Sequence, residues 1–271
     1  MILKPLLKRV YWILSSQFGI DPRKTVRALR GLPKYISDFR YFRRRYNGRL
    51  SLLPCLQDWY EEAGSANNEY FWQDLLVAKM IYAAKPEKHV DIGSRLDGFV
   101  AHVASFRDLE VFDVRPVSVK IPGITFKQAD LMQSDLIPEA YCDSLSCLHA
   151  LEHFGLGRYG DQIEALGFDR GLTNMAKILK NNGTFYLSVP VGEPRVEFNA
   201  HRVSNPRSIV RLARDNFLEL ANLTVIRQGH NVAQIEVDDE TIEGLSRQKY
   251  SLAIFKFIKK ERTTVSPAGN E

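Results

Sequence analysis

The sequence predicts an α/β fold, a doubly wound and mostly parallel sheet of seven strands that follows an N-terminal helical extension. From residue 89 onward, short apolar runs alternate with segments of helical spacing, as in βαβ units. One of these runs ends in an acidic residue and a glycine turn. The chain has 271 residues, 45% of them apolar, which is enough for one large α/β domain and an appendage.

Residues 1–50 are expected to form a basic, amphipathic helical arm. Apolar residues recur at helical spacing from Leu3 to Leu14, Asp21-Pro22 starts a second helix, and Gly31-Leu32-Pro33 breaks it. The arm contains thirteen Lys or Arg but only two acids, a balance of +11, whereas the remaining residues carry −6. Such an imbalance predicts an anionic partner.

The sequence leaves three alternatives for the partner of the arm. Cations alternate with aromatics over residues 40–46, which favours an anionic membrane surface, then docking on the main domain, and least a nucleic acid. The apolar stretch Val10 to Leu14 is too short to span a membrane and lacks a signal-peptide cleavage pattern. Three cysteines without CxxC spacing argue against disulfides or zinc. We therefore expect a cytoplasmic protein, peripheral to the inner membrane; its oligomeric state is not predicted.

Residues 51–88 are expected to form a linker and a helix over Phe71 to Tyr82, which packs on the edge of the sheet. The α/β domain spans residues 89–260, and a flexible tail follows at 261–271. Asn181-Asn182-Gly183 stops a helix before a strand, and the last two strands are expected to pair antiparallel. The predicted strands are 89–92, 109–113, 124–126, 143–148, 184–189, 223–228 and 251–258, and the helices 98–106, 168–180 and 205–217.

The run from His89 to Phe99 predicts a ligand site, because a buried strand ends at Asp91, turns at Gly93 and enters a helix. Asp113 ends the next strand, twenty residues after Gly93, where an acid can accept hydrogen bonds from a ribose diol. Arg95 replaces the middle glycine of a dinucleotide motif, which disfavours a pyrophosphate. Together these residues predict a nucleoside-type cofactor, with Asp97 capping the helix that begins at Gly98.

The order of these motifs resembles class I S-adenosylmethionine-dependent methyltransferases over about residues 86–260. The matching segments are Val90-Asp91-Ile92-Gly93, Asp113, Ala129-Asp130-Leu131, Asp143 to His153 with its Leu151-Glu152-His153 ending, and Leu179 to Pro190. More narrowly, "DIGSR", "HALEHFGLGRYGD" and "FNAHRV" resemble a little-characterised methyltransferase-like family often linked with bacterial surface-polysaccharide genes. That narrower similarity implies a setting and not a reaction.

The resemblance implies S-adenosylmethionine as cofactor. Asp91 and Gly93 would shape its methionine pocket, Asp113 would hold the ribose, and Asp130 with the backbone of Leu131 would read adenine. Each acid has an alternative role as a turn or helix cap. Arg95 either hinders the cofactor or pairs with its methionine carboxylate.

The acceptor side is expected in the loops after the fourth and fifth strands. Transfer to a saccharide hydroxyl needs a base, and the candidates are His149, Glu152, His153 and His201. Each has a structural alternative: His153 holding its loop through a backbone carbonyl, and Glu152 orienting a histidine or capping a turn. Arg158, Tyr159 and Arg202 are the candidate substrate-binding residues. The glycine-rich loop 155–160 either closes over the acceptor or is a surface connection. No metal is expected, because the sequence specifies no third ligand beside His149, Glu152 and His153.

The leading interpretation is thus O-methylation of a saccharide or a lipid-linked saccharide. The alternative is a catalytically silent scaffold of the same fold in a membrane-associated polysaccharide assembly. A nicotinamide oxidoreductase is disfavoured by Arg95. A nucleic-acid methyltransferase is disfavoured because the chain has no Asn/Asp-Pro-Pro-Tyr/Phe run.

Overall fold

The chain divides into two units in the computed structural model, Met1–Ser65 and Ala66–Glu271. The structure describes residues 3–61, 64, 66, 68–133, 138–227, 231–235 and 238–261. Residues 262–271 of the predicted flexible tail therefore lie outside the described residues. Each unit is taken by itself.

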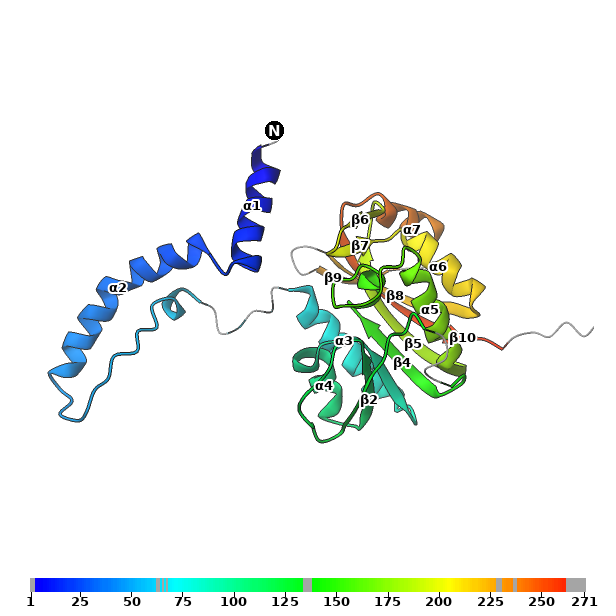
Figure 1. Cartoon of the computed structure of the whole chain (residues 1–271), viewed down its shortest axis with the longest axis horizontal. Coiled ribbons are helices and arrows are strands. Elements are labelled where there is room, and N and C mark those ends of the chain that lie inside the picture. The colour runs from blue at the N-terminus through cyan, green and yellow to red at the C-terminus, as the bar shows by residue number, and fades with distance from the viewer. Residues whose placement is uncertain are drawn as a thin grey trace, which may run out of the picture. The chain divides into compact units, whose positions relative to one another are not determined.

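The first unit contains two helices, α1 (Leu3–Gln17) and α2 (Pro22–Arg43), and a 3-10 turn at Asp58–Tyr60 (Figure 1). Asp21 caps α2 as its position predicts, because its carboxylate accepts from the N–H groups of Arg23 and Lys24. The expected break at Gly31-Leu32-Pro33 is wrong, since α2 runs through it. Pro33 removes a single N–H donor, and the turns on either side keep their hydrogen bonds.

Gly31 serves packing and not helix termination. A Cβ there would lie 2.3 Å from the carbonyl oxygen of Leu56, so only glycine lets the returning chain approach α2. A groove of about 310 Å³ lies along this contact. Its lining includes Tyr35, Phe39 and Trp59.

The second unit is built on an eight-stranded sheet of order β3-β2-β1-β4-β5-β10-β8-β9. The pairs among the first five strands are parallel, and β10 pairs antiparallel with β5 and β8. The strands are β1 (His89–Ile92), β2 (Leu109–Asp113), β3 (Ile124–Gln128), β4 (Cys142–Leu148), β5 (Leu179–Val191), β8 (Leu218–Arg227), β9 (Asn231–Ile235) and β10 (Ser251–Lys259). This confirms the doubly wound, mostly parallel α/β fold.

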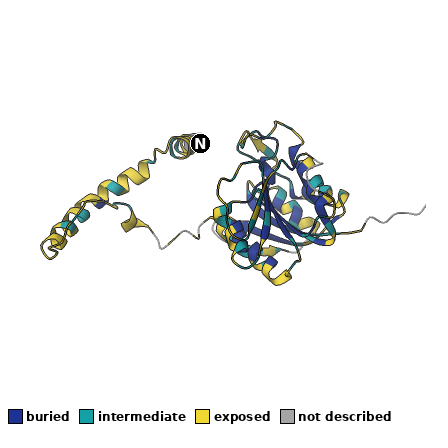
Figure 2. Ribbon diagram, turned by 60° about the horizontal axis from the view of Figure 1, so that its bottom comes forward, coloured by how far each residue is buried: buried dark blue, intermediate teal, exposed yellow. Residues whose placement is uncertain are grey.

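Helices cover both faces of this sheet, and Figure 2 shows its strands largely buried. One face packs on α3 (Glu69–Ala84), a π-helical turn at Leu96–Val100 and α4 (Ala101–Ala104). The other packs on α5 (Gly167–Ile178), α6 (Pro206–Asp215) and α7 (Asp239–Ser246). Side chains of β10 alternate between the faces: Leu252 and Ile254 on the first, Phe255 and Phe257 on the second.

The seven predicted strands are all present, and three more strands and the helix α7 were not predicted. A hairpin of β6 (Arg195–Glu197) and β7 (His201–Val203) follows β5, and β9 adds an eighth strand at the edge. The helix expected to reach residue 180 ends at Ile178, because Leu179 already pairs with Cys142 in the sheet. The last two predicted strands do pair antiparallel, with α7 between them.

Candidate functional site

The predicted site residues gather where the strand order reverses. The chain runs outward through β1, β2 and β3, then crosses back to β4 on the other side of β1. Ligands of open α/β sheets bind outside the carboxyl ends of the strands at such a switch point. Asp91, Asp113 and His149 lie at or just after the ends of β1, β2 and β4.

Asp91 is buried beneath the turn after β1 and stabilises it through hydrogen bonds. It is 0% exposed and accepts hydrogen bonds from the N–H and Oγ of Ser94 at 3.0 and 2.8 Å and from Ser146 Oγ at 2.6 Å. Burial raises the pKa of Asp91 to about 7, although these hydrogen bonds lower it. Its carboxylate therefore shapes the turn indirectly, without reaching a ligand.

Gly93 needs to be glycine for two reasons. Its φ is +73°, and a Cβ would lie 2.8 Å from the Cβ of Ala150. The turn after β1 thus abuts the loop after β4. This contact brings the two halves of the site together.

Arg95 does not fill the turn. Its side chain is 67% exposed, and its Nη2 lies 2.7 Å from Asp97 Oδ2. The expected helix cap by Asp97 is wrong, since Asp97 lies inside the π-helical turn and its carboxylate is paired with Arg95. An exposed ion pair of this kind contributes little stability.

Asp113 is held by a neighbouring arginine. Its Oδ1 accepts from the Arg115 backbone N–H at 2.8 Å and from Nε at 2.9 Å, and its Oδ2 accepts from Nη2 at 2.5 Å. The same guanidinium lies 4.5 Å from the centroid of the Tyr159 ring. A ribose diol at Asp113 would therefore share the carboxylate with Arg115.

Asp130 and Leu131 follow β3. The Asp130 Oδ1 accepts a hydrogen bond from the Met132 N–H at 2.9 Å. This contact is the one expected if Asp130 caps a turn, the alternative to reading adenine. The carbonyl of buried Leu131 accepts from Asn174 Nδ2 at 2.9 Å. No ligand contact of either residue follows from these bonds.

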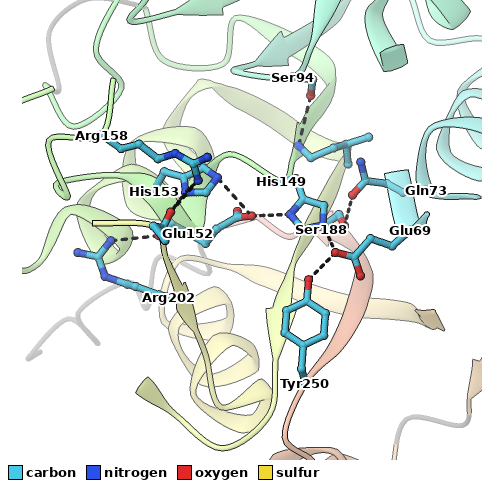
Figure 3. A network of polar contacts seen from close by, with 12 residues as sticks. Glu69, Gln73, Ser94, His149, Glu152, His153, Arg158, Ser188, Arg202 and Tyr250 are labelled. Atoms are coloured by element: carbon cyan, nitrogen blue, oxygen red, sulfur yellow. Dashed lines mark hydrogen bonds and ion pairs between the residues drawn. The ribbon is translucent and has the colours of Figure 1, made fainter. Parts of the chain in front are cut away.

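A buried cluster of charges occupies the end of β4 (Figure 3). His149 has a φ of +52°, and its side chain is 6% exposed. Its Nδ1 donates to Glu152 Oε1 at 2.6 Å, and its Nε2 forms an ion pair with Glu69 Oε1 at 3.2 Å, outside hydrogen-bond alignment. The hydroxyl of Tyr250 donates to the same Glu69 oxygen at 2.5 Å.

The two carboxylates favour the charged form of His149, which has no free lone pair, and this argues against the predicted role of His149 as a general base. Burial alone would lower the pKa of His149, but the carboxylates of Glu152 and Glu69 raise it to about 9. Burial alone would raise the pKa of Glu152. The charge of His149 and its hydrogen bond outweigh the effect of burial, so the pKa of Glu152 is lowered. The cluster thus contains one imidazolium between two carboxylates.

His153 differs from His149 in its protonation state. Its Nδ1 donates to the Ala200 carbonyl at 2.7 Å, which leaves the lone pair on Nε2. That Nε2 lies 3.7 Å from Glu152 Oε1, and Glu152 Oε2 is buried without a hydrogen-bond partner. Burial lowers the pKa of His153, so the ring is neutral. The bond to Ala200 is the predicted loop-holding contact, and it also fixes the tautomer.

His201 and Arg202 come from β7. The His201 ring packs edge-on against Tyr250, with centroids 6.4 Å apart, and burial lowers its pKa. Arg202 donates to the carbonyls of Phe154 at 2.5 Å and Ala165 at 3.3 Å. The guanidinium of Arg202 thus holds the loop after β4 to the hairpin, and its role in binding substrate stays a prediction.

Arg158 and Tyr159 lie in an ordered loop. Both oxygens of Asp161 accept from backbone N–H groups, those of Gly155 at 2.9 Å, Gly157 at 3.2 Å and Tyr159 at 3.1 Å. Arg158 donates to the Ala200 carbonyl at 2.8 Å and lies 5.1 Å from the Tyr159 ring centroid. Asp161 organises this loop, which favours the surface connection over a closing lid.

Sequence reasoning missed the contribution of α3. It took this helix as packing only, yet Glu69 and Tyr70 reach His149, whose ring packs against Tyr70 at a tilt of 32° with centroids 4.5 Å apart. Gln73 is buried and accepts from Ser188 Oγ at 2.5 Å. Asp74 Oδ2 would lie 2.8 Å from a Cβ on Gly98. The available signal was three polar residues, 69, 73 and 74, at i, i+4 and i+5 of an apolar helix.

Within the described part of the chain, no group of three or more His, Cys, Asp or Glu side chains is arranged to hold a metal ion. The three cysteines are free, with Cys55 exposed and Cys142 and Cys147 buried. Among the described residues, no helix has the length and apolar character needed to cross a membrane.

Comparisons with known proteins found one family model and several solved structures. A family model described as "Caenorhabditis protein of unknown function, DUF268" matches residues 128–246, and no curated protein matches the chain. The YcgJ protein of Bacillus subtilis is 14% identical, with a TM-score of 0.50 over 70% of this chain and 99% of that chain. At this identity the similarity shows the shared fold.

Two further solved structures are similar at lower scores. The 1,6-didemethyltoxoflavin-N1-methyltransferase of Burkholderia thailandensis, with bound S-adenosylhomocysteine, is 14% identical, with a TM-score of 0.49 over 89% of this chain and 92% of that chain. An N-methyltransferase of Haemonchus contortus, in complex with phosphomonomethylethanolamine and S-adenosylhomocysteine, is 14% identical, with a TM-score of 0.48 over 70% of this chain and 53% of that chain.

Proposed function

We propose that this chain is an S-adenosylmethionine-dependent methyltransferase that methylates an oxygen of a saccharide or lipid-linked saccharide. One observation carries the proposal. Asp91 and Asp113 lie at the carboxyl ends of β1 and β2, and Asp130 follows β3, beside a buried His149–Glu152–His153 cluster at the switch point. The motif order and the shared fold support the same conclusion.

The residues fit S-adenosylmethionine by their chemistry. Asp113 offers carboxylate oxygens to a diol. The cluster of Glu69, His149 and Glu152 has two negative charges for one positive, which favours a cationic sulfonium nearby. When bound, the cofactor supplies an electrophilic methyl group.

Removal of the acceptor proton is assigned to His153. Its Nδ1–H is directed to Ala200, so Nε2 is the atom that can accept a proton. Its lowered pKa keeps the ring neutral and available at neutral pH. His149, held as a cation, orients Glu152 and thereby positions His153.

The saccharide acceptor is supported by the resemblance of "HALEHFGLGRYGD" and "FNAHRV" to a family linked with surface-polysaccharide genes. A neutral hydroxyl is consistent with a neutral base at His153. We extend the proposal to the cytoplasmic side of a membrane, where lipid-linked saccharides are assembled.

Calorimetric titration of the whole chain with S-adenosylhomocysteine tests cofactor binding. We expect Asp113→Ala to weaken binding about tenfold, since it removes a charged acceptor worth roughly 1.4 kcal/mol, while Asp215→Ala, an exposed acid at the end of α6, leaves affinity unchanged. Absence of heat and of a melting shift at millimolar ligand would refute the enzyme and leave the scaffold alternative.

Turnover is tested with labelled S-adenosylmethionine and a lipid-linked saccharide extract. His153→Gln should abolish label transfer and keep cofactor affinity. Mass spectrometry of surface glycans, with and without the protein, should show a methyl-group difference. Label appearing only in protein or nucleic acid would overturn the saccharide assignment.

A further inference from the structure

The methyltransferase site leaves the first unit unexplained. Its helices α1 and α2 are largely exposed (Figure 2), and large apolar side chains lie on their surface. On α1, Leu7, Val10 and Phe18 at its end are 59%, 45% and 68% exposed. An isolated exposed apolar residue needs no explanation, but a continuous row of them marks an interaction surface.

On α2 the exposed apolar residues form one stripe. Val26, Leu29, Leu32 and Ile36 are 46%, 64%, 41% and 38% exposed, and their spacing of three or four residues places them on one helix face. We call these four residues the α2 stripe. The opposite face holds Gly31 and Tyr35, which border the groove against Leu56 and Trp59, so the returning chain covers that face and not the stripe.

A row of cations runs beside the α2 stripe. Arg23 and Arg30 lie three and four residues from Val26, and Arg40 and Arg43 lie four and seven residues from Ile36, so these four cations border the stripe along the helix. Residues 1–50 contain thirteen Lys or Arg and two acids. An amphipathic helix with apolar and basic faces side by side is suited to lie in the interface of an anionic bilayer.

We propose that the first unit docks on an anionic lipid bilayer through the α2 stripe and the exposed residues of α1, with the cation row on the lipid headgroups. Two other occupants fit less well. A nucleic acid would satisfy the cations but leave the aliphatic stripe without a partner. A second copy of the unit, whose net charge is +8, would bring two strongly basic surfaces together. This inference is independent of the proposed methyl transfer.

Flotation of the whole chain with vesicles tests the proposal. Vesicles of phosphatidylcholine with roughly a third phosphatidylglycerol should bind the protein, and vesicles of phosphatidylcholine alone should bind it at least tenfold more weakly. Added salt should weaken binding to the anionic vesicles.

Two variants separate the apolar and the basic contributions. Val26→Glu with Leu29→Glu should abolish binding, and Arg30→Gln with Arg40→Gln should weaken it by about fivefold per arginine. The matched control is Val119→Glu with Leu166→Glu, which places the same charges on equally exposed apolar residues of the second unit and should bind normally. Helix content from circular dichroism identifies a variant that fails to fold.

Equal binding to neutral and anionic vesicles, or normal binding by the Val26→Glu and Leu29→Glu variant, would overturn the proposal. So would tighter binding of the chain to duplex DNA or RNA than to anionic vesicles, or dimerisation lost in the stripe variant without any vesicle binding.

Discussion

The ion pair of His149 and Glu152 makes stability depend on pH in a defined direction. The folded-state pKa of His149 is about 9, against 6.5 for an unperturbed histidine. A raised histidine pKa means that folding favours the protonated form. The stabilisation is fully present below pH 6.5 and is lost as pH rises through 9. At about 1.4 kcal/mol per pKa unit, the loss between pH 6 and pH 9 is about 3 kcal/mol.

Replacing both partners isolates this contribution. The double variant His149→Gln with Glu152→Gln removes the imidazolium without leaving a buried carboxylate unpaired. Glu152 itself has a lowered pKa and stays ionised in the wild type throughout this range. Other groups, such as Asp91, titrate in both proteins and cancel in the comparison.

The assay is urea unfolding of both proteins at pH 6 and pH 9. The wild type should lose about 3 kcal/mol more free energy of unfolding than the double variant across this interval. Equal losses would mean that folded His149 is neutral, and the reasoning against it as a base would fail. The histidine proton signals, followed by NMR across the same range, give the pKa of His149 directly.

Three further predictions concern single contacts. Arg115→Ala frees the Asp113 carboxylate, so it should tighten S-adenosylhomocysteine binding severalfold by calorimetry; weaker binding would mean that Arg115 holds the ligand itself. Asp161→Ala removes the acceptor of three backbone N–H groups, so the amides of Gly155 and Gly157 should exchange about tenfold faster, and unchanged exchange would contradict the loop's ordering. Arg202→Met should cost about 1–3 kcal/mol in urea unfolding, since it removes a charged donor from the carbonyls of half-buried Phe154 and exposed Ala165, whereas Arg214→Met, exposed at the end of α6, should cost almost nothing.

Much of the fold could be predicted because its signals are local. The strands at 89–92 and 109–113 are short apolar runs bounded by turn residues, and the structure places β1 and β2 at those same residues. The hairpin of β6 and β7 was missed because its three-residue strands are too short for any periodicity to register. The helix break at Gly31–Pro33 was mispredicted because Gly31 is needed for close packing against the carbonyl of Leu56, which is distant in the sequence.

The sequence predicted where the candidate site residues lie but not which of their side chains are protonated. Strand ends and loop order were enough to bring Asp91, Asp113 and His149 to one edge of the sheet. Which histidine carries a proton depends on Glu69, eighty residues earlier in the chain, and on the Ala200 carbonyl. Spacing within the "HALEHF" segment gives no information about either neighbour.

The amino-acid sequence by itself determined where strands end, which acids and glycines stand at those ends, and that the first fifty residues are strongly basic. Only the tertiary structure decided that His149 is a cation, that His153 is neutral and that the Arg202 guanidinium binds carbonyls. The physical reason is that strand and turn formation depends on neighbours along the chain, whereas a protonation state depends on burial and on charges that folding brings from distant segments.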